Sequence, residues 1–453
     1  MSDLYNDRKR IVITGLGVVC SAGRTIDQFW SSLAGGRTQS EHAAATTPSS
    51  IAMTPGVADF SGTIEDFPGV PDTKRQAIRK GLKLMNRETR LGVAAGQQAL
   101  ADAGTMGQFD PQRFGVCFGA DNVSVMPEDF QRGITACSST AGEFDFARWG
   151  TEGLEQIAPL WILKCLPNMP ACHLAIINDL QGPTNTITQR DVSANIAIAE
   201  ACRGIRSGEL DAALVGATGT TLHAFSLMHA QLEDEVAGNV LCRPFDKRRT
   251  GSAPGEGAAA IVLENAQSAL RRGAPIYGEV VAWGASSCVG SANRTGKSEI
   301  GRTSADGRDT TRSRSCRKAM ASALRQTIRR AGWSPANVGH IHAHGLGTWQ
   351  SDIAEAQAIG EVFGESGPIV PIVAAKSYLG NSAAGAGMLE LVSSVLSLKY
   401  GHLFPVLNYE VPDPACAIRP VVDCDEPAGT SFLNLNAFGR GVASCVAIST
   451  WAA

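Results

Sequence analysis

The chain has 453 residues, 44% of them apolar and 18% charged, and its net charge is −3. It is too apolar for a disordered chain and too evenly charged for a strongly basic nucleic-acid-binding protein. The length predicts two or three folding units or one large fused unit. No run reaches the roughly 18 apolar residues of a membrane helix, so we expect a soluble, cytoplasmic protein. Twelve scattered cysteines without a CxxC pair favour reduced thiols over disulfides or a metal finger.

Short continuous apolar runs predict buried strands along the whole chain. In chain order they are 11–15, 113–119, 211–216, 258–263, 276–283, 339–343, 370–375, 431–436 and 442–448. Helical periodicity appears between them at 90–103, 192–206, 316–331 and 385–399. Strands alternating with helices long enough to cross over predict an α/β fold containing parallel strands.

The two halves of the chain share one plan, in which a glycine-rich turn runs into a second buried helix. That turn and helix are GPTNTITQRDVSANIAIAEA in the first half and KSYLGNSAAGAGMLELV in the second. A duplicated α/β unit explains this similarity, with halves at 1–265 and 266–453. Two stretches without periodicity, 38–73 and 288–315, are predicted to be loops.

Five segments carry a resemblance to a known family: IVITGLGVVCSAG, CRPFDKRRTGSAPGEGAAAIVLE, HAHGLGTWQSDIAEAQAI, AAKSYLGNSAAGAGMLELV and NAFGRGVAS. In order and spacing they resemble landmarks of the β-ketoacyl-acyl carrier protein synthases, in the elongating type II branch of the thiolase-like superfamily. The resemblance extends from about residue 9 to residue 450. It implies a five-layered α/β/α/β/α fold built from two duplicated halves, a dimer, and no cofactor.

The family's chemistry uses a cysteine that takes the acyl chain as a thioester, two histidines that stabilise the enolate formed from a malonyl unit, and a lysine. Carried over by motif, the first histidine is His344 and the lysine is Lys376. Asp352 and Glu355 occupy the acidic positions of the HGTxTxxxDxxE-like pattern, and Leu346 stands where a threonine is usual.

Three positions depart from the family pattern. The cysteine position, counted from the Gly-Pro landmark at 182–183, is Asp191. The second-histidine position is Asn381, and the gating phenylalanine is replaced by Arg440, in the same turn as Phe438. The resemblance places the last two residues against the substrate. An amide at Asn381 still donates to an enolate oxygen, as in the Cys-His-Asn set of the superfamily's initiating enzymes.

Asp191 has two interpretations. A carboxylate just before a helix is a favourable N-cap, which requires no catalysis. In a chemical role it would form a mixed anhydride, which hydrolyses far more readily than a thioester, and its charge would repel a malonyl carboxylate. We further predict that Arg440 pairs with Asp191 and fills the acyl site, against a simple solvated arginine.

Cys137 offers an alternative nucleophile, because TACSST at 135–140 matches the family's cysteine motif. Its context is wrong, since no apolar helix follows. His340, His342 and His344 alternate along a predicted strand, but no fourth ligand is near in sequence, so we predict no metal site.

One stretch, 74–90, carries seven basic residues against one acidic residue. It is either a solvated face or a docking site for an acidic acyl carrier protein. The residues of this basic patch are Lys74, Arg75, Arg79, Lys80, Lys83 and Arg87.

Three functions follow from the resemblance. The first is a non-condensing homologue in fatty-acid or polyketide biosynthesis that pairs with an active ketosynthase, as chain-length factors do, in a heterodimer or as a homodimer. The second is a residual malonyl-carrier decarboxylase or acyltransferase that uses His344, Asn381 and Lys376. The third is a scaffold or acyl-ligand-binding module.

Overall fold

A computed structural model describes residues 10–36, 56–67, 70–105, 107–121, 127–223, 226, 228, 241–288, 311–364, 370–439 and 441–452. In these ranges eleven strands are hydrogen-bonded in the order β3-β2-β4-β5-β1-β6-β11-β10-β7-β8-β9. The strands are β1 (Ile11–Cys20), β2 (Phe114–Gly119), β3 (Thr184–Ile187), β4 (Ala212–Thr220), β5 (Glu256–Asn265), β6 (Gly278–Ser287), β7 (His340–His342), β8 (Pro371–Val373), β9 (Arg419–Pro420), β10 (Ser431–Phe438) and β11 (Val442–Ser449).

The strand order confirms the duplication. In the first half the spatial order is β3-β2-β4-β5-β1, and in the second half it is β8-β7-β10-β11-β6. If these five strands of each half are numbered 1 to 5 along the chain, both orders read 3-2-4-5-1. The strand directions also agree. In both halves the first three strands in this order pair in parallel, and each of the last two strands pairs antiparallel with the strand before it. Only two residue pairs join β1 to β6, Val12 with Glu279 and Ile13 with Gly278, so the two sheets meet at a narrow seam.

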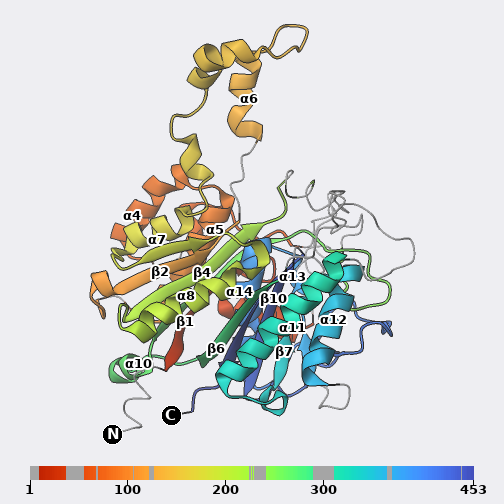
Figure 1. Ribbon diagram of the computed structural model, residues 1–453. Helices are drawn as coiled ribbons and strands as arrows, with labels where there is room; N and C mark the ends of the chain where they lie inside the picture. The colour runs from red at the N-terminus through yellow and green to blue at the C-terminus, as the bar shows by residue number, and fades with distance from the viewer. Residues whose placement is uncertain are drawn as a thin grey trace.

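Helices cover both sheets and fill the space between them (Figure 1). On the outer face of the first sheet lie α5 (Arg87–Asp102) and α7 (Met169–Asn178). Between the sheets lie α8 (Ser193–Ser207) and α14 (Ala386–Tyr400), which contact strands of both halves. Outside the second sheet lies α11 (Thr311–Ala331), with α12 (Trp349–Phe363) beside it. The predicted five-layered thiolase-like arrangement is thereby confirmed.

The central layer holds the main core. Every residue of α14 from Ala386 to Leu398 is buried, as expected of a helix with apolar or small residues on all sides. It packs with α8, β1 and β10 in one apolar cluster. Gly219 and Gly385 permit close approach here, because a Cβ on Gly219 would lie 2.2 Å from the Ser382 carbonyl oxygen.

The predicted strands and helices are present, with different ends. The predicted loop 288–315 is partly wrong, because α11 already begins at Thr311; residues 289–310 lie outside the described part. Of 38–73, residues 38–55 and 68–69 also lie outside it. The described remainder is loop except for a short 3₁₀ helix, Ile64–Asp66, and the start of α4 at Asp72. Further α-helices in the described ranges are α2 (Ile26–Ala34), α4 (Asp72–Gly81), α6 (Pro127–Ala136), α10 (Ala266–Arg272) and α13 (Lys376–Leu379).

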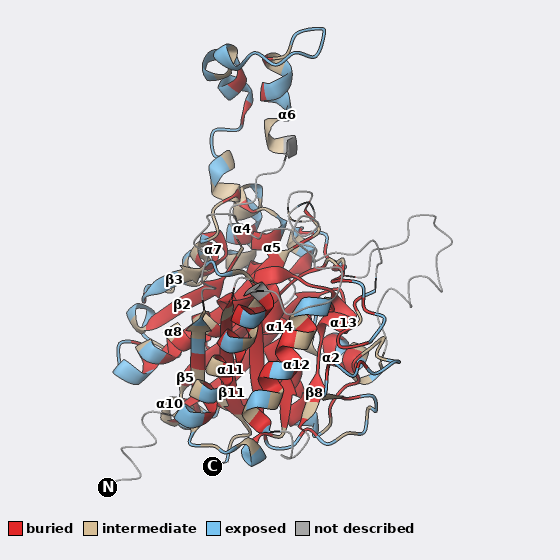
Figure 2. Ribbon diagram, turned by 45° about the vertical axis from the view of Figure 1, so that its right-hand side comes forward, coloured by how far each residue is buried: buried red, intermediate tan, exposed pale blue. Residues whose placement is uncertain are grey.

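Between β2 and α7 the chain leaves the body as an arm, residues 127–166, which carries α6 (Figure 1). Most of the arm is exposed, whereas the interior of the body is buried (Figure 2). Its large exposed apolar side chains are Ile134, Phe144, Phe146, Leu154, Leu160 and Ile162. A patch of this kind on a projecting segment is typical of a protein-contact surface.

Two bulk expectations can be compared with the structure. All twelve cysteines are free, in agreement with the predicted reduced thiols. Among the described helices, none combines the length and apolarity that crossing a bilayer would need.

Candidate active site at the centre of the two halves

The duplicated topology brings equivalent connections together. In the first half β3 leads through a 3₁₀ turn, Arg190–Val192, into α8. In the second half β8 leads through α13 and a 3₁₀ turn, Ala383–Gly385, into α14. The two 3₁₀ turns pack against each other. The sequence-predicted residues Asp191, Lys376 and Asn381 therefore come from matching places in the two halves.

Asp191 is only 4% exposed and lies in the turn that opens α8. Its Oδ1 atom is buried and accepts no hydrogen bond from any described residue. The N-cap interpretation is wrong in its hydrogen bond, since the cap of α8 is Val192 and no side chain caps it. Instead, the Ser193 hydroxyl accepts from the Gln189 amide at 2.8 Å. A buried carboxylate oxygen without a donor is costly unless a ligand or a nearby cation compensates.

Lys376 lies close enough to Asp191 for the charge of the carboxylate to act on its ammonium. Its ammonium pairs with Glu390 and donates to the His344 carbonyl oxygen at 2.9 Å. Burial lowers the pKa of Lys376, but the carboxylates of Glu390 and Asp191 outweigh that effect, so the pKa is raised. Asn436 donates to the other Glu390 oxygen at 2.5 Å. The buried ammonium thus forms an ion pair with Glu390 and interacts with Asp191 only through space.

His344 faces the same ammonium. The Lys376 Nζ atom lies 3.2 Å from His344 Nδ1. Burial and the charge of Lys376 hold the pKa of His344 well below its usual value, so the imidazole is neutral at physiological pH. With the ammonium donating to Nδ1, the ring proton belongs on Nε2, which becomes the hydrogen-bond donor.

The two predicted acidic positions hold the loop after β7 in place. Glu355 accepts from the backbone amides of His344 at 2.6 Å and Gly345 at 2.9 Å. Asp352 accepts from Gly347 at 3.0 Å. Burial raises the pKa of Glu355 to about 8 and that of Asp352 to about 6. Both side chains thus fix the backbone of the loop that carries His344.

Asn381 is engaged with its own turn. Its Oδ1 accepts from the Ala383 amide at 2.9 Å, and its backbone amide donates to the Ala253 carbonyl at 2.8 Å. The side-chain NH₂ is the part of Asn381 that can still donate to a substrate oxygen.

Phe438 ends β10 and is half-buried. The Arg190 guanidinium lies over its ring, 5.5 Å from the centroid, a cation–π arrangement. Arg190 has a positive φ of 49°, which is uncommon outside glycine and asparagine. Arg440 lies outside the described residues, so its pairing with Asp191 stays a prediction.

The alternative nucleophile Cys137 lies at the end of α6, in the projecting arm and away from the sheets that carry His344 (Figure 1). No apolar helix follows it, as the sequence indicated. Cys242 lies close enough to the cluster for Lys376 and Glu390 to influence it, but burial raises its pKa to about 12, so it stays a thiol. A thiol is a poor nucleophile compared with a thiolate.

The three alternating histidines do not share a ligand. His340 bonds the Ala428 carbonyl at 2.9 Å, and His342 bonds Ser394 at 2.9 Å. In the described part of the chain, no group of three His, Cys, Asp or Glu residues is arranged to hold a metal ion.

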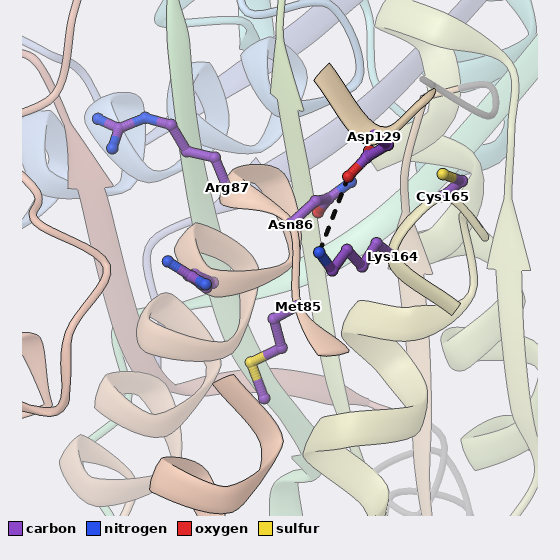
Figure 3. Close-up of a pocket in the computed structure, with 7 residues that line it drawn as sticks. Met85, Asn86, Arg87, Asp129, Lys164 and Cys165 are labelled. Carbon is purple, nitrogen blue, oxygen red and sulfur yellow. Dashed lines mark ion pairs between the residues drawn. The ribbon is translucent and has the colours of Figure 1, made fainter. Parts of the chain in front are cut away.

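A separate hollow of about 200 Å³ lies where the arm meets the body. It is lined by Met85, Asn86, Arg87, Arg90, Asp129, Lys164 and Cys165 (Figure 3). Lys164 reaches across to Asp129 at 3.8 Å, which ties the returning leg of the arm to the outgoing one. Arg87 points away from that pair and bonds Glu256. The hollow is therefore mostly a junction between the arm and the body.

Sequence reasoning missed Glu390 and Arg190. Glu390 had a signal, because it is the one acidic residue in the apolar run GMLELVSSVL, and a buried charge needs an opposite charge. Arg190 had none beyond its place beside Asp191, since the contact with Phe438 joins residues 248 positions apart only through the fold.

Two family models match the chain. The model described as "Beta-ketoacyl synthase, N-terminal domain" covers residues 8–269, and "Beta-ketoacyl synthase, C-terminal domain" covers residues 298–410. Among solved structures, "The ishigamide ketosynthase/chain length factor" is similar, with a TM-score of 0.76, 24% identity and coverage of 98% of this chain and 99% of that one.

Curated relatives span nearly the whole chain. The "3-oxoacyl-[acyl-carrier-protein] synthase 2" of Synechocystis sp. is 28% identical over 444 residues, 96% of each chain. The "Tetracenomycin polyketide synthase ketoacyl synthase alpha subunit" of Streptomyces glaucescens is 30% identical over 426 residues, 90% of this chain and 89% of the relative.

Proposed function

Because the chain belongs to the β-ketoacyl synthase family of fatty-acid and polyketide biosynthesis, we propose that it is a member that does not condense and that it pairs with an active ketosynthase, as a chain-length factor does. The observation that carries this proposal is Asp191 at the start of α8, where the family pattern has its cysteine. Condensation passes through a thioester on that residue, and a carboxylate cannot form one.

The rest of the cluster supports a retained fold with a lost nucleophile. Lys376, His344 and Glu390 keep their mutual contacts, although such a buried ion pair adds little stability over an apolar replacement.

A residual decarboxylase or acyltransferase remains the second candidate, because the His344–Lys376 contact is intact and the Asn381 amide can donate. Asp191 argues against decarboxylation, because its carboxylate would repel a malonyl carboxylate. A scaffold or acyl-ligand-binding module is the third candidate, and no contact at the site favours it over the first.

Docking of an acyl carrier protein is part of the proposal. Of the basic patch, Lys74 is bound to Asn178, Arg75 pairs with Glu65, and Arg87 pairs with Glu256. Arg79, Lys80 and Lys83 are exposed, and none of them forms an ion pair with a described residue. These three are the cations best placed to meet an acidic carrier.

Pairing with a second subunit is supported by two surfaces. The strand β3 ends the sheet with one unpaired side, and an open strand edge is a template for pairing. The arm that leaves the body before α7 and β3 exposes apolar side chains such as Phe146. A ketosynthase of the same fold, offering the same edge and an arm of its own, is the proposed partner; a second copy of this chain is the alternative.

The test is reconstitution with a cysteine-containing ketosynthase from the same cell. The products of that ketosynthase are measured with acyl- and malonyl-carrier proteins, alone and with this protein. We expect a heterodimer by sedimentation and a shifted chain-length distribution. Unchanged products and no heterodimer would contradict the partner role.

A further inference from the structure

The Oδ1 atom of Asp191 is buried and makes no hydrogen bond within the described part of the fold. Asp191 caps no helix, and its Oδ1 accepts no hydrogen bond from a described residue although the side chain is buried. A carboxylate in that state is a hydrogen-bond acceptor waiting for a donor from a ligand. A water molecule is the simplest donor that could occupy such a place beside a bound substrate.

We propose that Asp191 makes this protein a hydrolase of acyl thioesters, acting as the general base that activates water. The inference rests on the proposed function in one respect, namely that acyl thioesters reach Asp191. Carboxylates act as general bases when they lie within hydrogen-bond reach of the proton they take, directly or through water.

The reaction balances without any further reagent. Asp191 takes a proton from water as the water oxygen bonds to the thioester carbonyl carbon. The carbon–sulfur bond then breaks, and the departing sulfur takes the proton back from Asp191. The products are a carboxylic acid and a thiol. The neutral His344 offers its Nε2 proton to the negative oxygen of the intermediate.

The neighbours suit this role. The ammonium of Lys376 is hydrogen-bonded to Glu390 and His344, and no described hydrogen bond joins it to Asp191. No described residue therefore occupies Oδ1 of Asp191, which can accept a hydrogen bond from water. The pairing with Arg440 that the sequence predicts is compatible with this role only if it leaves Oδ1 open, because a carboxylate with both oxygens occupied is a weaker base.

The test uses octanoyl-N-acetylcysteamine, a small thioester that needs no carrier docking, and follows thiol release. Asp191→Asn keeps the shape and loses the base, so we expect a rate at least about 100-fold lower than that of the wild type. Asp211→Asn, a surface carboxylate paired with Arg113, is the matched control and should hydrolyse at the wild-type rate. Thermal unfolding confirms that each variant is folded.

Asp191→Cys separates the two proposals. It should take up one acyl group, seen by intact mass, which shows that thioesters reach this residue. A wild type no faster than Asp191→Asn overturns hydrolysis. If Asp191→Cys is then acylated, the site assignment in the proposed function stands; if it is not, that assignment fails too. Trapping an acyl group on wild-type Asp191 with hydroxylamine would overturn the general-base role in favour of direct attack.

Discussion

At the scale of single residues, breaking the buried ion pair of Lys376 and Glu390 on one side is expected to lower stability strongly, because both side chains are buried. Replacing it, by Lys376→Met, leaves Glu390 without its counter-charge. We expect a loss of about 3–5 kcal/mol in the free energy of unfolding, as for other buried pairs broken on one side. Urea unfolding followed by circular dichroism measures it.

The double variant Lys376→Met/Glu390→Gln should lose less than the single variant, because no charge is then stranded. Arg113→Ala breaks an exposed ion pair with Asp211 and serves as the control, with an expected loss below about 1 kcal/mol. Equal losses for the buried and exposed pairs would contradict the role given to Lys376.

Glu355 gives a pH dependence. Its folded-state pKa is raised to about 8, so the folded protein holds a proton that the unfolded chain releases near its ordinary value of 4.5. Stability from this group is present at low pH and is lost as pH rises between these values, by at most about 1.4 kcal/mol per pH unit. Urea unfolding from pH 5 to pH 8 should therefore show a shallower fall for Glu355→Gln than for the wild type. Parallel curves would show that Glu355 is ionised throughout.

The sequence predicted only some of the residues of the candidate site. Asp191, His344 and Lys376 were identified through the resemblance to the family's motifs, which the sequence carries at the ends of its strands. The resemblance missed Arg190 over Phe438, since that contact depends on how the two halves fold together.

At the scale of elements, α8 contacts the second half of the chain through a buried polar side chain, Asn195. Asn195 donates to the Asn434 carbonyl at 3.0 Å and to the Ser444 carbonyl at 3.3 Å, in β10 and β11. Asn195→Ala removes these two buried hydrogen bonds and the oxygen that accepts from the Asn434 side-chain amide, so it should cost about 1–3 kcal/mol in unfolding free energy. Arg203→Ala, on the exposed face of the same helix, should stay within about 0.5 kcal/mol. Similar small effects of both changes in a chemical denaturation series would refute this link.

Element prediction succeeded where burial is complete. Runs such as 258–263 are apolar throughout because both faces of the strand are covered, and this pattern survives any error in register. Prediction of elements failed where contacts between distant parts of the chain, and not the local sequence, determine the secondary structure. The sequence did not predict the strand β3, whose residues TNTI are polar and partly exposed, or the helix α6 in the projecting arm.

At the scale of the whole molecule, the arm and β3 are expected to meet a second subunit. The double change Phe144→Ser/Phe146→Ser removes exposed apolar surface from the arm, so it should weaken the dimer more than tenfold without lowering the melting temperature. Leu270→Ser, on the exposed side of α10, is the control. Sedimentation over a concentration series measures the dissociation constants. An unchanged constant would exclude the arm from the interface.

The fate of an acyl chain offered to the pure protein tests the central claim most directly. The protein is incubated with labelled acyl-carrier protein and malonyl-carrier protein, and intact mass and product analysis follow. Because a carboxylate occupies the position of the thiol, we predict neither a stable acyl-enzyme nor a β-ketoacyl product. A condensed product, or an acyl group that stays on the protein, would contradict the account.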